Sequence, residues 1–483
     1  MKRLIAALDQ RQLIGIVGDQ ASRQGIAVNF FGRPALFATG PFELAYGRNV
    51  LIFPAFVHRV RGPFHRIIVE PPIALSHDGP KDEAIRAGIE QFAAALARHI
   101  REAPHQWLWM HKRWKHTTAR TALVLSDGKA GHVKQSLAVV EALRQRCPGL
   151  TYDVVEVRYR SATARAAALL WGWWMPRGTG GGVLRWALAP ESATALLSRH
   201  ADVFISCGSS AAPANLLWAE ENQAKSVVIM NPAPLPLRRF SLVICPRHDR
   251  LPKRSNVVRT VGALVGEMPD ESLHQARERL RVHPKFRAGP GEEGRGRPVR
   301  QQHPVVAVFL GGDTLHYEIN PAFAEGLIGQ VLAVCEAVDG WCLVTTSRRT
   351  SSVVEQVLGA RLVHHPRCRL FLAASRDPLN GTMEGMLGSA DVAVVTGESI
   401  SMVSEACASG RRVVVVEPPH RGTPPSQLSK HQRFLRDVVK DGYGRLVPLG
   451  DLGLAVHSTL ADRRPSKRLD SLAAVRDAVS RLL

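Results

Sequence analysis

The chain's 483 residues leave room for about two to four domains, and 45% apolar with 22% charged residues is a globular rather than a disordered composition. Lysine and arginine outnumber aspartate and glutamate by 63 to 42, and this net charge of +21 favours anionic partners, although an arginine-rich composition without functional meaning explains it equally well. The sequence has no paired Cys/His zinc spacing, RNP-like aromatic string or basic heptad region, which argues against nucleic-acid binding.

Neither secretion nor a membrane-spanning helix is indicated. The seven cysteines are scattered and form no C-x-x-C, which predicts reduced thiols in a cytosolic compartment. The opening residues, MKRLIAALDQRQ, lack the apolar core and cleavage site of a signal peptide. No apolar run approaches the roughly 18–20 residues of a membrane helix. The nearest, ARAAALLWGWWMP at 164–176, suits either a membrane interface or a buried helix end.

Strand-like and helix-like segments alternate along most of the chain. The run TALVLS at 121–126 precedes the helix-like QSLAVVEALRQR, and further β-branched runs follow at short intervals. The stretch 283–303 is rich in Gly, Pro and Arg and has no periodicity, which predicts a flexible linker or loop. The alternation then resumes and ends in a carboxyl-terminal helix, SLAAVRDAVSRLL. This alternation predicts parallel α/β layers.

The two α/β halves have similar sizes, which predicts two Rossmann-like lobes with a ligand-binding cleft at the carboxyl ends of the strands. We expect the first lobe at 117–282, the linker at 283–303, and the second lobe with the carboxyl-terminal helix at 304–483. A partial α/β module at 1–116 precedes them, and the aromatic-basic segment QWLWMHKRWKHTTART marks its end.

The segment TGESISMVSEACASG at 396–410 joins two β-branched runs and carries the first candidate ligand site. Ser399 is a natural N-cap for the helix that follows, and the free amides at a helix start attract phosphate. Ser401 and Glu405 share one helix face, where Glu405 can accept hydrogen bonds from a ribose diol. A capped crossover helix with a solvated glutamate explains the same pattern without a ligand, and Glu398 receives no role. The residues expected to face the sheet are Ile400, Val403 and Cys407.

Two further strand ends in the second lobe suit a phosphate. VFLGGDT at 308–314 pairs Gly311 with Gly312, which lets the backbone approach a phosphate closely. WCLVTTSRRTSS ends a strand with hydroxyls followed by Arg348 and Arg349, whose guanidinium groups suit a diphosphate. Three such loops in one lobe indicate a phosphate site more strongly than any one of them.

In the first lobe, LVLSDGKAGHVKQS at 123–136 brings polar residues to the end of the first strand. Asp127 or His132 can serve there as the base for an acceptor hydroxyl. For His132, a surface or packing role is an equally good interpretation, although it stands among glycines where a helix begins. For His248, in the segment CPRHD, a surface or packing role is the better interpretation.

Taken together, these segments resemble the bacterial and plant family named after the mitochondrial fission ELM protein, which is classed with the GT-B glycosyltransferases. The matching segments run in order from 121 to 448 and are LSDGKAGHVKQS, ISCGSSAAP, IMNPAP, CPRHD, FLGGD, TTSRRTS and TGESISMVSEACASG. The resemblance implies that the second lobe binds a nucleotide sugar as co-substrate and that Glu405 holds its ribose. It implies neither a metal nor a bound cofactor, because helix amides and cations neutralise the leaving diphosphate. The residues implied near the diphosphate are Ser399, Ser401, Gly311 and Gly312.

The first module resembles the carboxyl-terminal half of the lipid A lauroyl/myristoyl acyltransferases. The matching segments are GIVGDQASRQGIAVNFFGRPALFATGP, LIFPAFVHRVRGPFHRIIVEPPI and QWLWMHKRWK. Those enzymes use an H-x4-D/E dyad, in which the histidine deprotonates the acceptor hydroxyl, upstream of the GDQ segment. Only seventeen residues precede that segment here. Asp19 matches a functional position of the family, but without the dyad we expect an inactive module.

Two pairs in this module have the dyad spacing, and both are interpreted as chance. His65 and Glu70 lie in a strand-like run, where residues five apart point to opposite faces. His77 and Asp82 lie in a Gly-Pro turn downstream of the family position. Either the chain is a truncated or late-started version of a longer fusion, whose upstream part holds the dyad, or the remnant serves only to dock to lipid or membrane.

The favoured function is a glycosyltransferase that acts at the cytoplasmic face of the inner membrane on a lipid-linked or lipopolysaccharide-related acceptor. The acyltransferase-like module suggests a lipid A context, and the positive charge suits an anionic membrane surface. One alternative is a lipid A acyltransferase in truncated or fused form. Another is a non-catalytic, membrane-associated scaffold. No nucleic-acid partner is expected.

Overall fold

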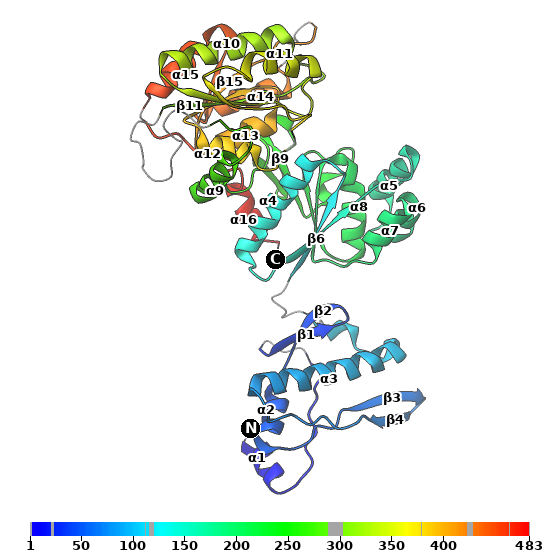
Figure 1. The fold of residues 1–483 in the computed structure, drawn as a ribbon. Coiled ribbons are helices and arrows are strands. Elements are labelled where there is room, and N and C mark those ends of the chain that lie inside the picture. The colour runs from blue at the N-terminus through cyan, green and yellow to red at the C-terminus, as the bar shows by residue number, and fades with distance from the viewer. Residues whose placement is uncertain are drawn as a thin grey trace. The chain divides into compact units, whose positions relative to one another are not determined.

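The chain folds into two compact units, Met1–Arg120 and Thr121–Leu483, in a computed structural model (Figure 1). None of the helices it describes combines the length and apolarity that a membrane crossing requires. Most of the predicted linker, residues 288–302 of 283–303, lies outside the described part of the chain. The described residues are 2–20, 24–111, 113–114, 120–287, 303–377, 379–422, 428–462 and 464–482.

The first unit is a small α/β assembly around one long helix, α3. An apolar stripe at helical spacing on α3 packs against the hairpin formed by β1 and β2. β3 and β4 form a second antiparallel hairpin. The stripe is formed by Ile85, Ile89, Ala93, Leu96 and Ile100. The elements are α1 (Lys2–Asp9), β1 (Ile26–Phe30), β2 (Arg33–Phe37), α2 (Gly40–Arg48), β3 (Ala55–Arg61), β4 (Phe64–Val69), α3 (Lys81–Glu102), η1 (Pro104–Gln106) and η2 (Trp109–His111).

The first lobe of the second unit is a six-stranded parallel sheet in the order β10-β9-β8-β7-β5-β6, with helices on its two faces (Figure 1). Two of its inner strands, β7 and β9, are buried along their whole length, as largely apolar runs predict. The elements in this part of the chain are β5 (Thr121–Ser126), α4 (Ala130–Arg146), β6 (Thr151–Glu156), α5 (Ala162–Trp174), α6 (Gly181–Ala187), α7 (Pro190–Leu197), β7 (Val203–Cys207), α8 (Gly208–Glu221), β8 (Lys225–Ile229), η3 (Leu237–Arg239), β9 (Leu242–Pro246), η4 (Arg247–Asp249), β10 (Val257–Thr260) and α9 (Asp270–Arg281).

The second lobe repeats this architecture, with six parallel strands in the order β13-β12-β11-β14-β15-β16. Alternate residues of β14 enter two separate cores: Ala393 and Val395 on one face, Val392 and Val394 on the other. The elements in this part of the chain are β11 (Val305–Phe309), α10 (Pro321–Ala337), β12 (Trp341–Thr345), α11 (Ser352–Leu362), β13 (Cys368–Leu372), α12 (Thr382–Ser389), β14 (Val392–Thr396), α13 (Ile400–Ala408), β15 (Arg412–Val416), α14 (Lys430–Lys440), β16 (Arg445–Val447), η5 (Leu449–Asp451), α15 (Leu452–Ala461) and α16 (Ala473–Val479).

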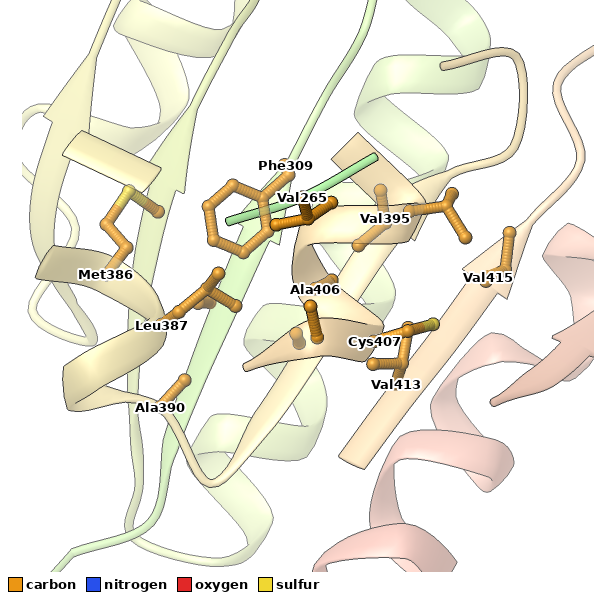
Figure 2. Packing of buried hydrophobic residues seen from close by; sticks show 14 of the residues in the cluster. Val265, Phe309, Met386, Leu387, Ala390, Val395, Ala406, Cys407, Val413 and Val415 are labelled. Atoms are coloured by element: carbon orange, nitrogen blue, oxygen red, sulfur yellow. The ribbon is translucent and has the colours of Figure 1, made fainter. Parts of the chain in front are cut away.

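The predicted fold class is confirmed: the protein is α/β, with two Rossmann-like, GT-B-like lobes after a smaller α/β unit. Two segments, however, pack with the lobe opposite to the one that the sequence predicts. α9, expected in the first lobe, lies against α12, and its Leu273 and Leu280 belong to a second-lobe core. Val265, just before α9, enters the same core beside Phe309 and Ala406 (Figure 2).

The carboxyl-terminal helix α16 makes the reverse exchange. It packs on α4 and β10, so that Leu472, Val475 and Val479 complete the core of the first lobe. The packing therefore differs from the predicted lobe bounds, 117–282 and 304–483, at the carboxyl-terminal end of each lobe. The reason is physical: periodicity shows that a helix has an apolar face, but it does not say which sheet covers that face.

Candidate functional site

Three strand ends of the second lobe form the candidate donor site. β11 is a central strand and lies between β12 and β14. The backbone N–H of Gly311 donates to Thr396 Oγ1 at 2.8 Å, and Thr350 Oγ1 donates to the Gly311 carbonyl oxygen at 2.6 Å. The three loops that the sequence marked as suited to phosphate are therefore brought together by direct hydrogen bonds.

Gly311 and Gly312 are required by close packing of these loops on one another. A Cβ on Gly311 would lie 1.4 Å from Glu398 Oε1, and a Cβ on Gly312 would lie 2.2 Å from the carbonyl carbon of Arg349. The sequence predicted that these glycines bring the backbone close to a phosphate. In the structure, their amides already donate to Thr396 Oγ1 and, at 3.2 Å, to Glu398 Oε1.

Glu398, which received no role from the sequence, is the most buried acid of the site. Only 1% of its surface is exposed, Oε1 accepts the Gly312 N–H, and Oε2 has no hydrogen-bond partner among the described residues. Burial raises the pKa of this carboxyl to about 7, against smaller opposing contributions from nearby N–H groups and Arg349. Glu398 therefore titrates near neutral pH.

The start of α13 has the predicted position but not the predicted cap. Ser399 is the N-cap residue, yet its side chain makes no capping hydrogen bond, so the first amides of the helix lack that partner. Ser401 is exposed on the first turn. Arg348 and Arg349 are also exposed, and Arg349 donates to the Asp313 carbonyl oxygen at 3.5 Å. The predicted apolar face of α13 is buried: Ile400 partly, Val403 and Cys407 fully.

Glu405 does not project freely into solvent but meets a lysine from the other lobe. Its Oε2 lies 2.8 Å from Nζ of Lys134 on α4, and the same ammonium lies 3.0 Å from Glu384 Oε1 on α12. Burial raises the pKa of Glu405, and Lys134 opposes that shift. Burial alone lowers the pKa of Lys134, but its two carboxylate partners outweigh it and the net shift is upward. One ammonium between two carboxylates at these distances is an ion pair, with Lys134 protonated.

Asp127 and His132, the candidate bases of the first lobe, form a hydrogen-bonded pair. His132 Nδ1 lies 3.0 Å from both carboxylate oxygens of Asp127, and Ser210 Oγ donates to Asp127 Oδ2 at 2.5 Å. Burial alone raises the pKa of Asp127, but the Ser210 hydrogen bond and the nearby His132 outweigh it and lower the pKa. A Cβ on Gly208 (φ +81°) would lie 2.9 Å from His132 Cε1, so the absence of a side chain at this position leaves room for the imidazole.

This arrangement fixes the roles that the pair can take. An ionised Asp127 accepts from Nδ1–H of His132, which leaves the lone pair on Nε2. Within the described residues, no hydrogen bond occupies Nε2. His132 is therefore equipped to act as a base, and Asp127 to orient it.

In the first unit, neither pair with dyad spacing is joined by a hydrogen bond between described residues. His65 lies 2.9 Å from the Pro63 carbonyl oxygen, and His77 stacks on Tyr46. Burial lowers the pKa of the Arg113 guanidinium to about 10. The carboxylate of Asp19 lies close enough to oppose this shift.

Two residues of the candidate site, Glu398 and Lys134, received no role from the sequence. Glu398 is two positions beyond a buried strand, and only its tight packing against two glycines distinguishes it from an ordinary loop acid. Lys134 lies two residues after His132 within LSDGKAGHVKQS, and residues two apart do not share a helix face, so local spacing did not mark it. Its partners, 250 and 271 residues away, could not be foreseen.

Comparison with known proteins assigns most of this chain to one family. The model of the family described as Mitochondrial fission ELM1 matches residues 130–482. The chain belongs to that family. Residues 1–116 match a second model, bacterial lipid A biosynthesis acyltransferase. Both resemblances that the sequence predicted are therefore confirmed.

Two curated relatives match this ELM1-family chain over part of their length. Mitochondrial fission protein ELM1 of Arabidopsis thaliana is 28% identical over 230 residues, which are 43% of this chain and 49% of the relative. Uncharacterized protein RP120 of Rickettsia prowazekii is 24% identical over 144 residues, which are 29% of this chain and 38% of the relative. The chain thus spans half or less of these relatives.

Among solved structures, UDP-GlcNAc 2-epimerase from Methanocaldococcus jannaschii is similar at 11% identity and a TM-score of 0.44, covering 74% of this chain and 98% of that one. The glycosyltransferase SnogD from Streptomyces nogalater is similar at 15% identity and a TM-score of 0.36, covering 75% of this chain and 94% of that one. Because these scores lie below 0.5, the fold assignment rests on the strand orders described above.

Proposed function

We propose that the second unit is a glycosyltransferase that moves a sugar from a nucleotide-sugar donor to an acceptor hydroxyl. The observation that carries this proposal is the contact between Lys134 and Glu405. It joins the start of α4, which holds His132, to the face of α13 that the family resemblance assigns to the donor. A base and an anion-binding helix start thus belong to facing elements.

On the donor side, the amides at the start of α13 bind the diphosphate, because Ser399 does not cap them and a helix start favours an anion. The exposed guanidinium groups of Arg348 and Arg349 add positive charge. Glu405 keeps Oε1 free of hydrogen bonds from described residues, and this oxygen accepts from the ribose diol. No metal is needed if these groups neutralise the leaving diphosphate.

On the acceptor side, Nε2 of His132 takes the proton of the acceptor hydroxyl as its oxygen bonds to the anomeric carbon of the sugar. The bond from that carbon to the diphosphate oxygen breaks, and the nucleoside diphosphate leaves with the electron pair. Asp127 keeps the imidazole in the required tautomer and stabilises the imidazolium that forms.

An arginine-lined cavity supports an anionic acceptor. It has a volume of about 390 Å³ and lies between η4 of the first lobe and α14 of the second. Arg433 is engaged by the His248 carbonyl oxygen at 2.9 Å, whereas the side chains of Arg250 and Arg436 have no partner among the described residues. A phosphorylated, lipid-linked saccharide fits this charge, and the match of residues 1–116 supports a lipid A context. The arginines are Arg247, Arg250, Arg259, Arg433 and Arg436.

Exposed aromatic residues on α5 and α6 support peripheral binding to the cytoplasmic face of the inner membrane. Of the two interpretations of the segment 164–176, a buried helix end does not fit, because two of its three tryptophans are exposed. Tryptophan and leucine side chains beside arginines favour the interface of an anionic membrane. The exposed apolar residues are Leu170, Trp173, Trp174, Met175 and Trp186.

The deciding experiment is calorimetric titration of common nucleotide sugars into the full chain. We expect one donor to bind, and Glu405→Ala to weaken it at least about tenfold, as for loss of a charged hydrogen-bond acceptor. Glu384→Ala is the matched control, since it removes the other carboxylate that contacts the Lys134 ammonium without touching the ribose. Absence of binding by the unmodified chain to every donor would refute the transferase.

A non-catalytic, membrane-associated scaffold is the second candidate. It is favoured by one observation: the amides of Gly311 and Gly312 already donate to acceptors within the chain, so these two N–H groups are not available to a ligand. A chain that sediments with anionic vesicles but binds no donor would support this candidate.

A further inference from the structure

Three side chains with metal-ligating atoms converge in the first unit, apart from the transferase site. His58 comes from β3, and His99 and Glu102 come from the last turn of α3, where residues three apart share a face. Their ligating atoms, one from each residue, lie within 4.8 Å of one another.

The spacing of these atoms suits a small divalent cation. His58 Nε2 lies 3.2 Å from His99 Nδ1, and Glu102 Oε2 lies 3.7 Å from the same nitrogen. Tetrahedral zinc with bonds of about 2.0–2.1 Å holds its ligand atoms about 3.3–3.4 Å apart. The separation of the two imidazole nitrogens therefore already matches that of two ligands of one ion, and Glu102, whose side chain is 55% exposed, can close on it from solvent.

The central histidine is held by a carboxylate on its other nitrogen. Glu70 Oε1 lies 2.7 Å from His99 Nε2, while Arg98 donates to Glu70 Oε2 at 2.6 Å. The two oxygens of Glu70 are therefore engaged as acceptors, one by Arg98 and the other by His99. His99 must then carry its proton on Nε2 and direct the lone pair of Nδ1 toward His58.

Packing fixes the same ring. His99 is 6% exposed, and Phe56 stacks on it with ring centroids 4.2 Å apart. Zinc-binding histidines use the same arrangement: a buried imidazole whose one nitrogen donates to a carboxylate while the lone pair of the other points toward the remaining ligands.

We propose that His58, His99 and Glu102 bind a divalent transition cation of the Zn²⁺ class, with solvent completing the coordination. Two imidazoles and a carboxylate suit zinc and exclude Mg²⁺ and Ca²⁺, which prefer oxygen ligands. This site departs from the sequence-based expectation that the chain binds no metal. Without an ion, the same residues form a hydrogen-bonded chain from Glu70 through His99 to His58.

The test is competition for Zn²⁺ between the full chain, stripped of metal, and a chromophoric chelator. Because other histidines bind zinc weakly, the result is the difference between variants. We expect His58→Ala and Glu102→Gln each to remove one equivalent of tight binding or to weaken it at least about tenfold. Co²⁺ should show the strong visible absorption of tetrahedral coordination in the unmodified chain and lose it in the two site variants.

Two matched controls lie on neighbouring surfaces of the same unit. His65→Ala removes an exposed histidine of β4, and Glu90→Gln removes an exposed acid of α3; both should bind zinc as the unmodified chain does. Glu102 is exposed, so its variant keeps the test valid if His58→Ala fails to fold. Equal stoichiometry and affinity in the unmodified chain and both site variants would overturn the proposal and leave the hydrogen-bonded chain.

Discussion

The two halves of the proposed transferase site differ in how far the folded chain already satisfies their polar groups. On the first lobe, Asp127 and His132 form a pair that leaves one nitrogen, Nε2, available for a proton. On the second lobe, the amides of Gly311 and Gly312 are bonded within the chain, and the acid they pack against is buried. The first half is therefore prepared for proton transfer. In the second half, the groups left to bind a diphosphate are the amides at the start of α13, not those of the glycine loop.

The largest effect expected from this comparison is on the first half. His132→Gln should lower the rate of sugar transfer about 10²–10⁴-fold, because it removes the proposed base. Initial rates with the donor found by titration would measure it, and donor affinity should change little. His200→Gln, an exposed histidine bonded to Asn222, is the control. An unchanged rate would remove His132 from the mechanism.

The next effect tests the buried acid of the second half. The unfolded chain releases the Glu398 proton near 4.5, whereas the folded chain holds it until about 7, so this residue makes stability fall as pH rises across that window. Glu398→Gln removes the penalty. We expect the variant to exceed the unmodified chain by about 3 kcal/mol in free energy of unfolding above pH 7, and by nothing below pH 4.5.

Urea unfolding of both proteins at several pH values measures this difference, and Glu90→Gln should show no such dependence. A difference between the Glu398 variant and the unmodified chain that stays constant across the window would show that Glu398 does not titrate there.

A third prediction concerns the close packing of the glycine loop. Gly311→Ala should destabilise the chain by about 1–3 kcal/mol, because the new Cβ overlaps the Glu398 carboxylate. Adding Glu398→Ala should restore most of the loss. Gly329→Ala on α10, where the nearest atom to the new Cβ is 3.8 Å away, is the control and should be neutral or stabilising. If the double variant is as unstable as Gly311→Ala alone, the lost stability comes from a change in the backbone and not from the overlap with Glu398.

The smallest effect is expected at the bridge between the halves. Lys134→Met removes the ammonium from Glu384 and Glu405, and should cost roughly 1 kcal/mol in unfolding free energy because the lysine side chain is 47% exposed. The effect should shrink with added salt, as for a partly exposed ion pair. Lys440→Met, at the end of α14, is the control. A loss of unfolding free energy that does not change with salt would show that the lysine stabilises the fold by packing and not by its charge.

Much of the site was predictable where local pattern carried the information. The position of Ser399 as N-cap, the buried face formed by Val403 and Cys407, and the polar cluster of Asp127 and His132 all follow from spacing within a few residues. Such features depend on backbone geometry, which a short segment sets by itself.

The remaining features depend on which distant surfaces meet. The sequence by itself determined the α/β class, the strand ends that carry polar residues, and the two families that the chain resembles. Only the tertiary structure decided that Glu405 meets Lys134, that Glu398 is buried, and that α9 and α16 exchange lobes. Burial and ion pairing arise between residues far apart in the chain, and no local spacing encodes them.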